Sequence, residues 1–121
     1  MIAFARRPPL NCDLRRLTWR FMGQYVCLWE FQARAGRQAE FERHYGPDGA
    51  WVTLFRQAPG YIDTLLLRDR SHSLRYVTVD RWVSVDAYRA FRDGFSRQYD
   101  ELDRLCDGLT TQETPLGEFT D

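Results

Sequence analysis

The chain has 121 residues, of which 44% are hydrophobic and 15% aromatic, which is enough for one domain with its own core. Its formal net charge is zero, so the composition predicts no general attraction to nucleic acid or to a membrane surface. All 17 basic residues are Arg, which we interpret as the coding bias of a GC-rich bacterial genome.

The cysteines argue against a disulfide framework or a zinc site. Cys12, Cys27 and Cys106 are odd in number and have no paired spacing, and the two histidines are not clustered with other ligands. Arg and Pro interrupt the N-terminus, and no segment approaches the roughly 18–20 apolar residues of a membrane span. We therefore expect a cytoplasmic protein in a reducing compartment, with no metal and no membrane partner.

Residues 1–22 differ from the rest of the chain, because they contain two prolines, several arginines and no steady period. Two hypotheses account for them. The segment is an extension upstream of a natural start at Met22, or it is an arm that packs on a partner. The folded domain is then expected to span 23–121.

Hydrophobic periodicity and turn residues predict seven elements after this segment. Asp48 is placed to cap the second helix, Ser84 to cap the third, and Pro115 suits an edge strand better than a central one. In chain order the expected elements are a strand at 25–34, a helix at 37–45, a short helix at 50–58, a strand at 61–68, a strand at 74–83, one long helix at 84–107 and a strand at 110–119.

The order β-α(α)-β-β-α-β predicts an α+β fold of the ferredoxin-like, split βαβ type, with an antiparallel sheet and the helices on one face. The first two strands are apolar on both faces. Since helices cover only one face, the other would be a large exposed apolar patch. A second copy of the same sheet would cover it, which predicts a two-fold homodimer.

Three stretches carry a family resemblance: "WEFQARAGRQAEFERHYG", "FRQAPGY" and "VDRWVSVDAYRAF". Over about 23–119 the chain resembles the antibiotic biosynthesis monooxygenase superfamily of dimeric α+β barrels. The resemblance implies a pocket between the sheet and its helices in each subunit. It also implies oxygenation without metal or flavin, because a deprotonated phenolic substrate can itself reduce oxygen in an apolar, water-poor site.

The resemblance assigns positions to particular residues. Trp82 matches the pocket Trp of the anthrone-oxidising relatives, and Tyr88 matches their helical Tyr six residues later. The Asn that these relatives place four residues before the Trp is Thr78 here, which weakens that match. The haem-degrading branch is disfavoured, because 25–34 contains no Asn and 84–107 contains no His.

Eight residues are candidates for a site, and each also has an ordinary structural interpretation. Trp82 and Tyr88 are equally suited to a core. Asp80 is either a base with a raised pKa or an ion-pair partner for an Arg. The catalytic candidates are Trp82, Tyr88, Asp80 and His44, and the substrate-binding candidates are Thr78, Tyr76, Trp51 and Phe55.

Three functions remain open at this stage. The first is a cofactor-independent monooxygenase acting on a hydrophobic aromatic compound of the anthrone or quinol type. The second is a non-enzymatic dimeric binding or regulatory module, and the third is a polyketide-type cyclase or isomerase. A closed apolar pocket with convergent polar groups would favour an enzyme, whereas Trp82 and Tyr88 packed solidly with no void would remove the main support for a catalytic function.

We expect the protein to elute as a dimer at micromolar concentration, because a second sheet is the simplest cover for the apolar face. Size-exclusion chromatography with light scattering measures the mass directly. A monomer mass at that concentration would contradict the prediction.

Overall fold

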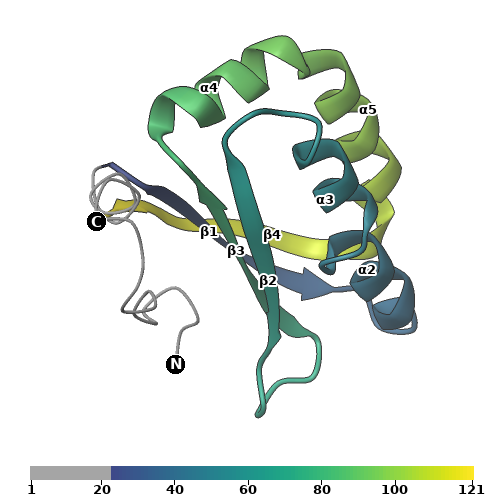
Figure 1. Ribbon diagram of the computed structural model, residues 1–121. Helices are drawn as coiled ribbons and strands as arrows, with labels where there is room; N and C mark the ends of the chain where they lie inside the picture. Colours follow the sequence, from purple (N-terminus) through teal and green to yellow (C-terminus); the bar gives the residue numbers. More distant parts are fainter. Residues whose placement is uncertain (1–22) are drawn as a thin grey trace.

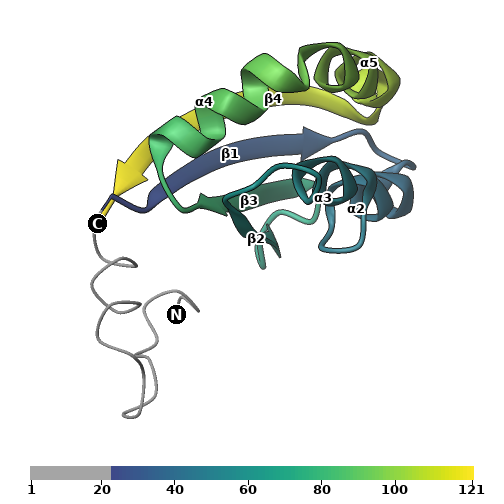
Figure 2. The same ribbon diagram turned by 45° about the horizontal axis from the view of Figure 1, so that its top comes forward.

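The computed structural model describes residues 23–121, and residues 1–22, with both hypotheses about them, lie outside the described residues. The described part forms one antiparallel sheet with its helices gathered on one face (Figures 1 and 2). Within this part, no helix is long and apolar enough to cross a membrane.

The sheet has four strands in the order β2-β3-β1-β4, and all neighbouring pairs are antiparallel. This confirms the predicted α+β, ferredoxin-like sheet and the edge position of the last strand. The strands are β1 (Tyr25–Ala33), β2 (Tyr61–Arg68), β3 (Arg75–Trp82) and β4 (Thr110–Thr120).

The helices follow the predicted order, with one correction described below. They are α2 (Gln38–Tyr45), α3 (Ala50–Phe55), α4 (Val85–Gly94) and α5 (Ser96–Cys106), followed by a 3-10 turn at Asp107–Leu109. Helices α4 and α5 cross the sheet at one end and then turn down beside α3 (Figure 1).

The prediction of one helix over 84–107 is wrong, because the chain bends between α4 and α5. Phe95 separates the two helices with φ −122° and ψ 26°, and Gly94 just before it has low helix propensity. Aromatic packing continues through the bend, with the rings of Phe91 and Phe95 stacked 5.6 Å apart. The bend lets one continuous stripe of side chains follow the twisted sheet.

One of the two predicted helix caps is present in the structure. The Ser84 cap is confirmed, because the Ala87 amide donates to Ser84 Oγ at 3.0 Å. The Asp48 cap is wrong: Gly49 is the residue before α3, and no side chain caps this helix. A Cβ at Gly49 would lie 2.4 Å from the His44 carbonyl oxygen, so the chain is packed too closely there for another residue.

The two faces of the sheet differ in what covers them. One face packs against the helices through a core that includes Phe41, Tyr76, Trp82 and Phe91, all at most 1% exposed. On the opposite face lie alternate residues such as Leu67, which is 48% exposed. That face carries apolar side chains together with the ion-paired Glu30, Arg75 and Arg81, and it is the surface for which the sequence predicts a second copy of the chain.

Gly60 lies in the turn that leads into β2, and its replacement tests how tightly this turn is packed. It has φ +91°, and an added Cβ would lie 2.7 Å from the Ala87 Cβ. We expect Gly60→Ala to lower the free energy of unfolding by about 1–3 kcal/mol, because it adds backbone strain and a clash. Gly94→Ala is the matched control, since its Cβ would meet nothing within 4 Å. Urea unfolding of both variants measures the difference, and equal stabilities would contradict the expectation.

Candidate functional site

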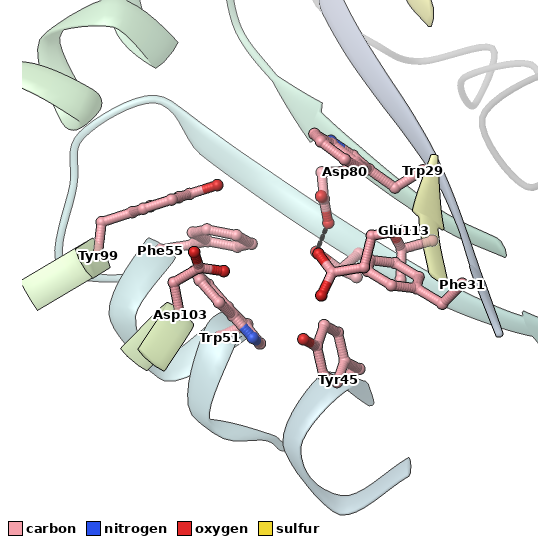
Figure 3. A pocket seen from close by; sticks show the side chains of 11 residues that line it. Trp29, Phe31, Tyr45, Trp51, Phe55, Asp80, Tyr99, Asp103 and Glu113 are labelled. Atoms are coloured by element: carbon pink, nitrogen blue, oxygen red, sulfur yellow. Dashed lines mark hydrogen bonds between the residues drawn. The ribbon is translucent and has the colours of Figure 1, made fainter. Parts of the chain in front are cut away.

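A cavity of about 180 Å³ lies between the middle of the sheet and the helices α2, α3 and α5 (Figure 3). It is partly open to solvent. For comparison, an enclosed cavity of about 150 Å³ can hold benzene. The side chains that line it are Trp29, Phe31, Tyr45, Trp51, Phe55, Thr64, Thr78, Asp80, Tyr99, Asp103 and Glu113.

Small polar side chains on the sheet make the room for this cavity. Cross-strand register places Thr64 opposite Asp80, and Thr78 opposite Trp29. Thr64 and Thr78 are buried, and neither is long enough to reach the helices above them. The space over the centre of the sheet therefore stays open.

Aromatic rings form the walls and hold one another in place. The ring centroids of Phe31 and Tyr45 are 4.9 Å apart, and those of Trp51 and Tyr99 are 5.0 Å apart in an edge-on contact. Trp51 also contacts Phe55, with centroids 6.0 Å apart. Such tilted contacts are the favoured geometry of aromatic pairs, so the walls are rigid.

Asp80 is the polar centre of the cavity. The Thr64 hydroxyl donates to Asp80 Oδ1 at 2.6 Å, and the oxygens of Tyr61 and Thr64 are 2.8 Å apart. Since the single Thr64 hydrogen goes to the carboxylate, the Tyr61 hydroxyl must donate to Thr64. A chain of two hydrogen bonds therefore leads from half-buried Tyr61 to the carboxylate.

Burial raises the pKa of Asp80 to about 6. The hydrogen bond from Thr64 acts in the opposite direction, and the negative charge of Asp63 adds a smaller upward contribution. The carboxylate is closely surrounded and yet keeps some surface toward the cavity. A carboxylate with a pKa near 6 is mostly ionised at neutral pH and is a stronger base than an ordinary Asp.

The structure brings four of the eight predicted site residues together. Thr78, Asp80, Trp51 and Phe55 all line the cavity, with the first two on β3 and the others on α3. The face of β3 that carries Thr78 and Asp80 is thus the floor of a real cavity.

Trp82 is not among the lining residues. It is fully buried and packs against the rings of Phe55, Tyr61, Tyr88 and Phe91, with centroids between 5.1 and 5.6 Å away. Its indole nitrogen has no hydrogen-bond partner among the described residues. Trp82 thus supports Phe55 from behind and does not face the cavity.

The other three predicted residues also lie outside the cavity lining. The Tyr88 hydroxyl accepts a hydrogen bond from Arg92 at 3.2 Å. The Tyr76 hydroxyl donates to the Glu42 carboxylate beside a separate surface depression. His44 Nδ1 lies 2.9 Å from a backbone carbonyl one turn earlier in α2.

A comparison with family models gives a direct assignment. The model described as antibiotic biosynthesis monooxygenase (ABM) matches residues 24–96, which is more than half of the chain. The chain belongs to the ABM family. This confirms the resemblance inferred from the sequence. No curated protein matches the chain significantly.

Solved structures agree with this ABM assignment. SnoaB from Streptomyces nogalater, described as a cofactor-independent oxygenase, is 26% identical with a TM-score of 0.61, over 82% of this chain and 93% of that chain. A protein from Bordetella bronchiseptica, assigned as an antibiotic biosynthesis monooxygenase, is 24% identical with a TM-score of 0.67, over 83% and 98% of the two chains. The second likeness bears on the fold alone.

Much of the cavity wall of this ABM chain was not predicted from the sequence. Trp29 and Phe31 lie on a strand that is apolar on both faces, and Tyr99 lies among the aromatic residues of a helix, and neither pattern by itself indicates a cavity. Asp103 lies four residues after Tyr99 and so shares its helix face, which was an available signal. Glu113 is opposite Phe31 in the register of β4 against β1, and this pairing was not accessible from local patterns.

Among the described residues, no group of three or more His, Cys, Asp or Glu is arranged to hold a metal ion. This includes the three carboxylates of the cavity, Asp80, Asp103 and Glu113.

The raised pKa of Asp80 predicts a specific dependence of stability on pH. Its folded-state pKa of about 6 exceeds the ordinary value of 3.8, so the folded protein binds the proton more strongly than the unfolded chain. The contribution of this group to stability therefore falls as pH rises from about 4 to about 6 and stays low above that. We expect Asp80→Asn to be more stable than the parent by about 1–2 kcal/mol at pH 7.5, a value discounted for solvent in the cavity.

Urea unfolding at pH 4.5 and pH 7.5 measures this difference. Asp93→Asn, an exposed change on α4, is the control and is expected to leave the pH dependence unaltered. An Asp80→Asn variant that is less stable than the parent at pH 7.5 would contradict the burial argument.

Proposed function

We propose that the protein is a cofactor-independent monooxygenase that acts on a hydrophobic aromatic compound of the anthrone or quinol type. The observation that carries the proposal is a single carboxylate, Asp80, that faces an aromatic-walled cavity with a pKa raised to about 6. Membership of the ABM family and the likeness to SnoaB support the reaction class.

The chemistry requires a base and a site that excludes bulk water. Asp80 removes a proton from the substrate, and the resulting electron-rich anion donates electrons to molecular oxygen. A peroxide forms on the substrate carbon, its O–O bond breaks, and one oxygen atom stays as a carbonyl. The second oxygen leaves as water, with the proton returned from Asp80. For a methylene substrate the balance is CH₂ + O₂ giving C=O + H₂O, so the substrate itself supplies the electrons.

The neighbouring hydroxyls assist this proton transfer in our proposal. Thr64 holds the Asp80 carboxylate in one orientation, and Tyr61 completes the hydrogen-bonded chain. Burial raises the pKa of Tyr61 to about 12, so Tyr61 keeps its proton and remains a donor near neutral pH. Thr78 lies two residues from Asp80 on the same face of β3 and is placed to contact a substrate oxygen.

We assign Trp82 and Tyr88 a positioning role in place of contact with substrate. The Trp82 ring touches Phe55 and Tyr61, which are part of the cavity wall and of the hydrogen-bonded chain respectively. Nothing in the geometry favours a catalytic role for His44 or Tyr76. The case for catalysis thus rests on Asp80.

We also propose that the working form is a homodimer whose sheets face each other. Thr64 and Leu66 of β2 point toward the helices, so Leu65 and Leu67 point to the opposite face. Phe119 of β4 pairs with Val26 on that same face and is 46% exposed. An apolar sheet face of this kind is typically covered by another layer.

Oxygen uptake with anthrones and quinols tests the proposed reaction. We expect measurable uptake by the parent protein and a loss of at least about 100-fold in kcat for Asp80→Asn, because a positioned base contributes roughly 10²–10⁴. The kcat/KM of the parent is expected to rise with pH through about 6, and Asp93→Asn is expected to behave like the parent.

Asp80→Ala with added formate separates a base from a merely structural Asp, since formate can enter the vacated space. Recovery of uptake is expected. Ligand binding without oxygen uptake would favour the binding module, and conversion without oxygen uptake would favour the cyclase or isomerase.

A further inference from the structure

The charged side chains that line the cavity are all acidic. Three carboxylates belong to it, Asp80, Asp103 and Glu113, whereas no Arg or His among the described residues lines it. Figure 3 shows the three carboxylates reaching toward the same space from β3, α5 and β4. Thr110 donates a hydrogen bond to Glu113 at 2.9 Å, and neither Asp103 nor Glu113 forms an ion pair within the described part of the chain.

The aromatic walls also favour a positively charged ligand. Rings of Trp, Tyr and Phe attract a cation to their faces, most strongly where water is excluded. One wall residue already makes this contact, because the Arg92 guanidinium carbon lies 3.9 Å from the centroid of the Tyr99 ring. Arg92 itself is not among the lining residues, so the cavity is left without a cation of its own.

The indole N–H of Trp51 indicates where an oxygen atom of the ligand would bind. Trp51 is 8% exposed, and its buried Nε1 makes no hydrogen bond of standard geometry among the described residues, although the Tyr45 hydroxyl and the Cys106 thiol lie near it. The nitrogen-bearing edge of this ring points toward the neighbouring Tyr45, whose ring centroid is 6.1 Å from that of Trp51 (Figure 3). A buried N–H without a partner costs free energy, so an oxygen acceptor on a ligand would be favoured there.

We propose that the cavity selects an aromatic compound that carries a hydroxyl or carbonyl oxygen and, on the other side of the ring, a protonated or quaternary amine. The cationic group lies near Asp103 and Glu113 at the mouth, and the oxygen lies deeper, toward Asp80 and Trp51. The oxygen-bearing part of this assignment rests on the proposed function. The cationic part rests on the charge and the rings alone.

This charge also removes a difficulty in the proposed reaction. Proton transfer to Asp80 moves one negative charge onto the substrate, beside the remaining carboxylates of Asp103 and Glu113, which is unfavourable in a partly desolvated cavity. A positive group on the same ligand offsets that repulsion.

Three ligands of nearly equal shape test the proposal with the full chain. They are (4-hydroxyphenyl)trimethylammonium, its neutral carbon analogue 4-tert-butylphenol, and the anion 4-hydroxybenzenesulfonate. Isothermal titration calorimetry at pH 7.5 and low salt measures each Kd. We expect the cation to bind at least about tenfold more tightly than the neutral phenol, and the anion more weakly than the neutral phenol.

Paired variants assign the preference to the cavity mouth. Asp103→Asn with Glu113→Gln is expected to reduce the preference for the cation to less than about threefold and to leave the Kd of the neutral phenol unchanged. Asp100→Asn with Glu101→Gln is the matched control, because it removes two charges from exposed residues of α5 that do not line the cavity. The control pair is expected to keep the preference of the parent.

Equal binding of the cation and the neutral phenol would overturn the proposal, as would an unchanged preference in the mouth variant or a failure of all three ligands to bind. These results are independent of the oxygen-uptake assay. A protein that prefers the cation but consumes no oxygen with any anthrone, quinol or aminophenol fails the proposed function and retains the ligand assignment.

Discussion

The burial of the Asp80 carboxylate under a layer of aromatic rings is the constraint on which the candidate site depends. A carboxylate that points toward the core is costly unless donors satisfy it. Two neighbours reduce this cost, because Thr64 donates directly and Tyr61 donates to Thr64. The β2–β3 register places Thr64 opposite Asp80, so the same pairing that builds the sheet also holds the acid. The remaining cost appears as a raised pKa.

Aromatic residues fill one end of the space between the sheet and the helices and leave its centre open. At the α4 end, Trp82, Tyr88 and Phe91 fill the space over the sheet with ring on ring. At the centre of the sheet, the small side chains of Thr64 and Thr78 take the place of such large rings. The volume of the side chains on the sheet therefore decides where the cavity lies, and the large side chain of Trp82 closes the cavity at the α4 end. This accounts for the position of Trp82 beside the cavity wall and outside its lining.

Local patterns in the sequence were sufficient for the elements and the sheet, and insufficient for the mouth of the cavity. Period-two alternation puts Thr78 and Asp80 on one face of β3, which is the face that lines the cavity, and Ser84 caps its helix as its residue type suggests. The bend at Phe95 was missed because an aromatic stripe can continue across two helices. Glu113 was missed because its position depends on β4 pairing with β1 through register shifts at two places. Long-range register of this kind leaves no local signature.

Ligand charge and the basicity of Asp80 are coupled, and this links the chemistry to the selection of ligand. An uncharged aromatic ligand that displaces water would raise the pKa of Asp80 further, because desolvation is already the main cause of the shift. A smaller fraction of the Asp80 carboxyl would then be ionised at neutral pH. A ligand with a positive group has the opposite effect, since a nearby cation stabilises the carboxylate. By linkage, ionised Asp80 in turn strengthens binding of the cation by the same factor. A cationic aromatic compound is thus the kind of ligand that keeps this base active while it fills the cavity.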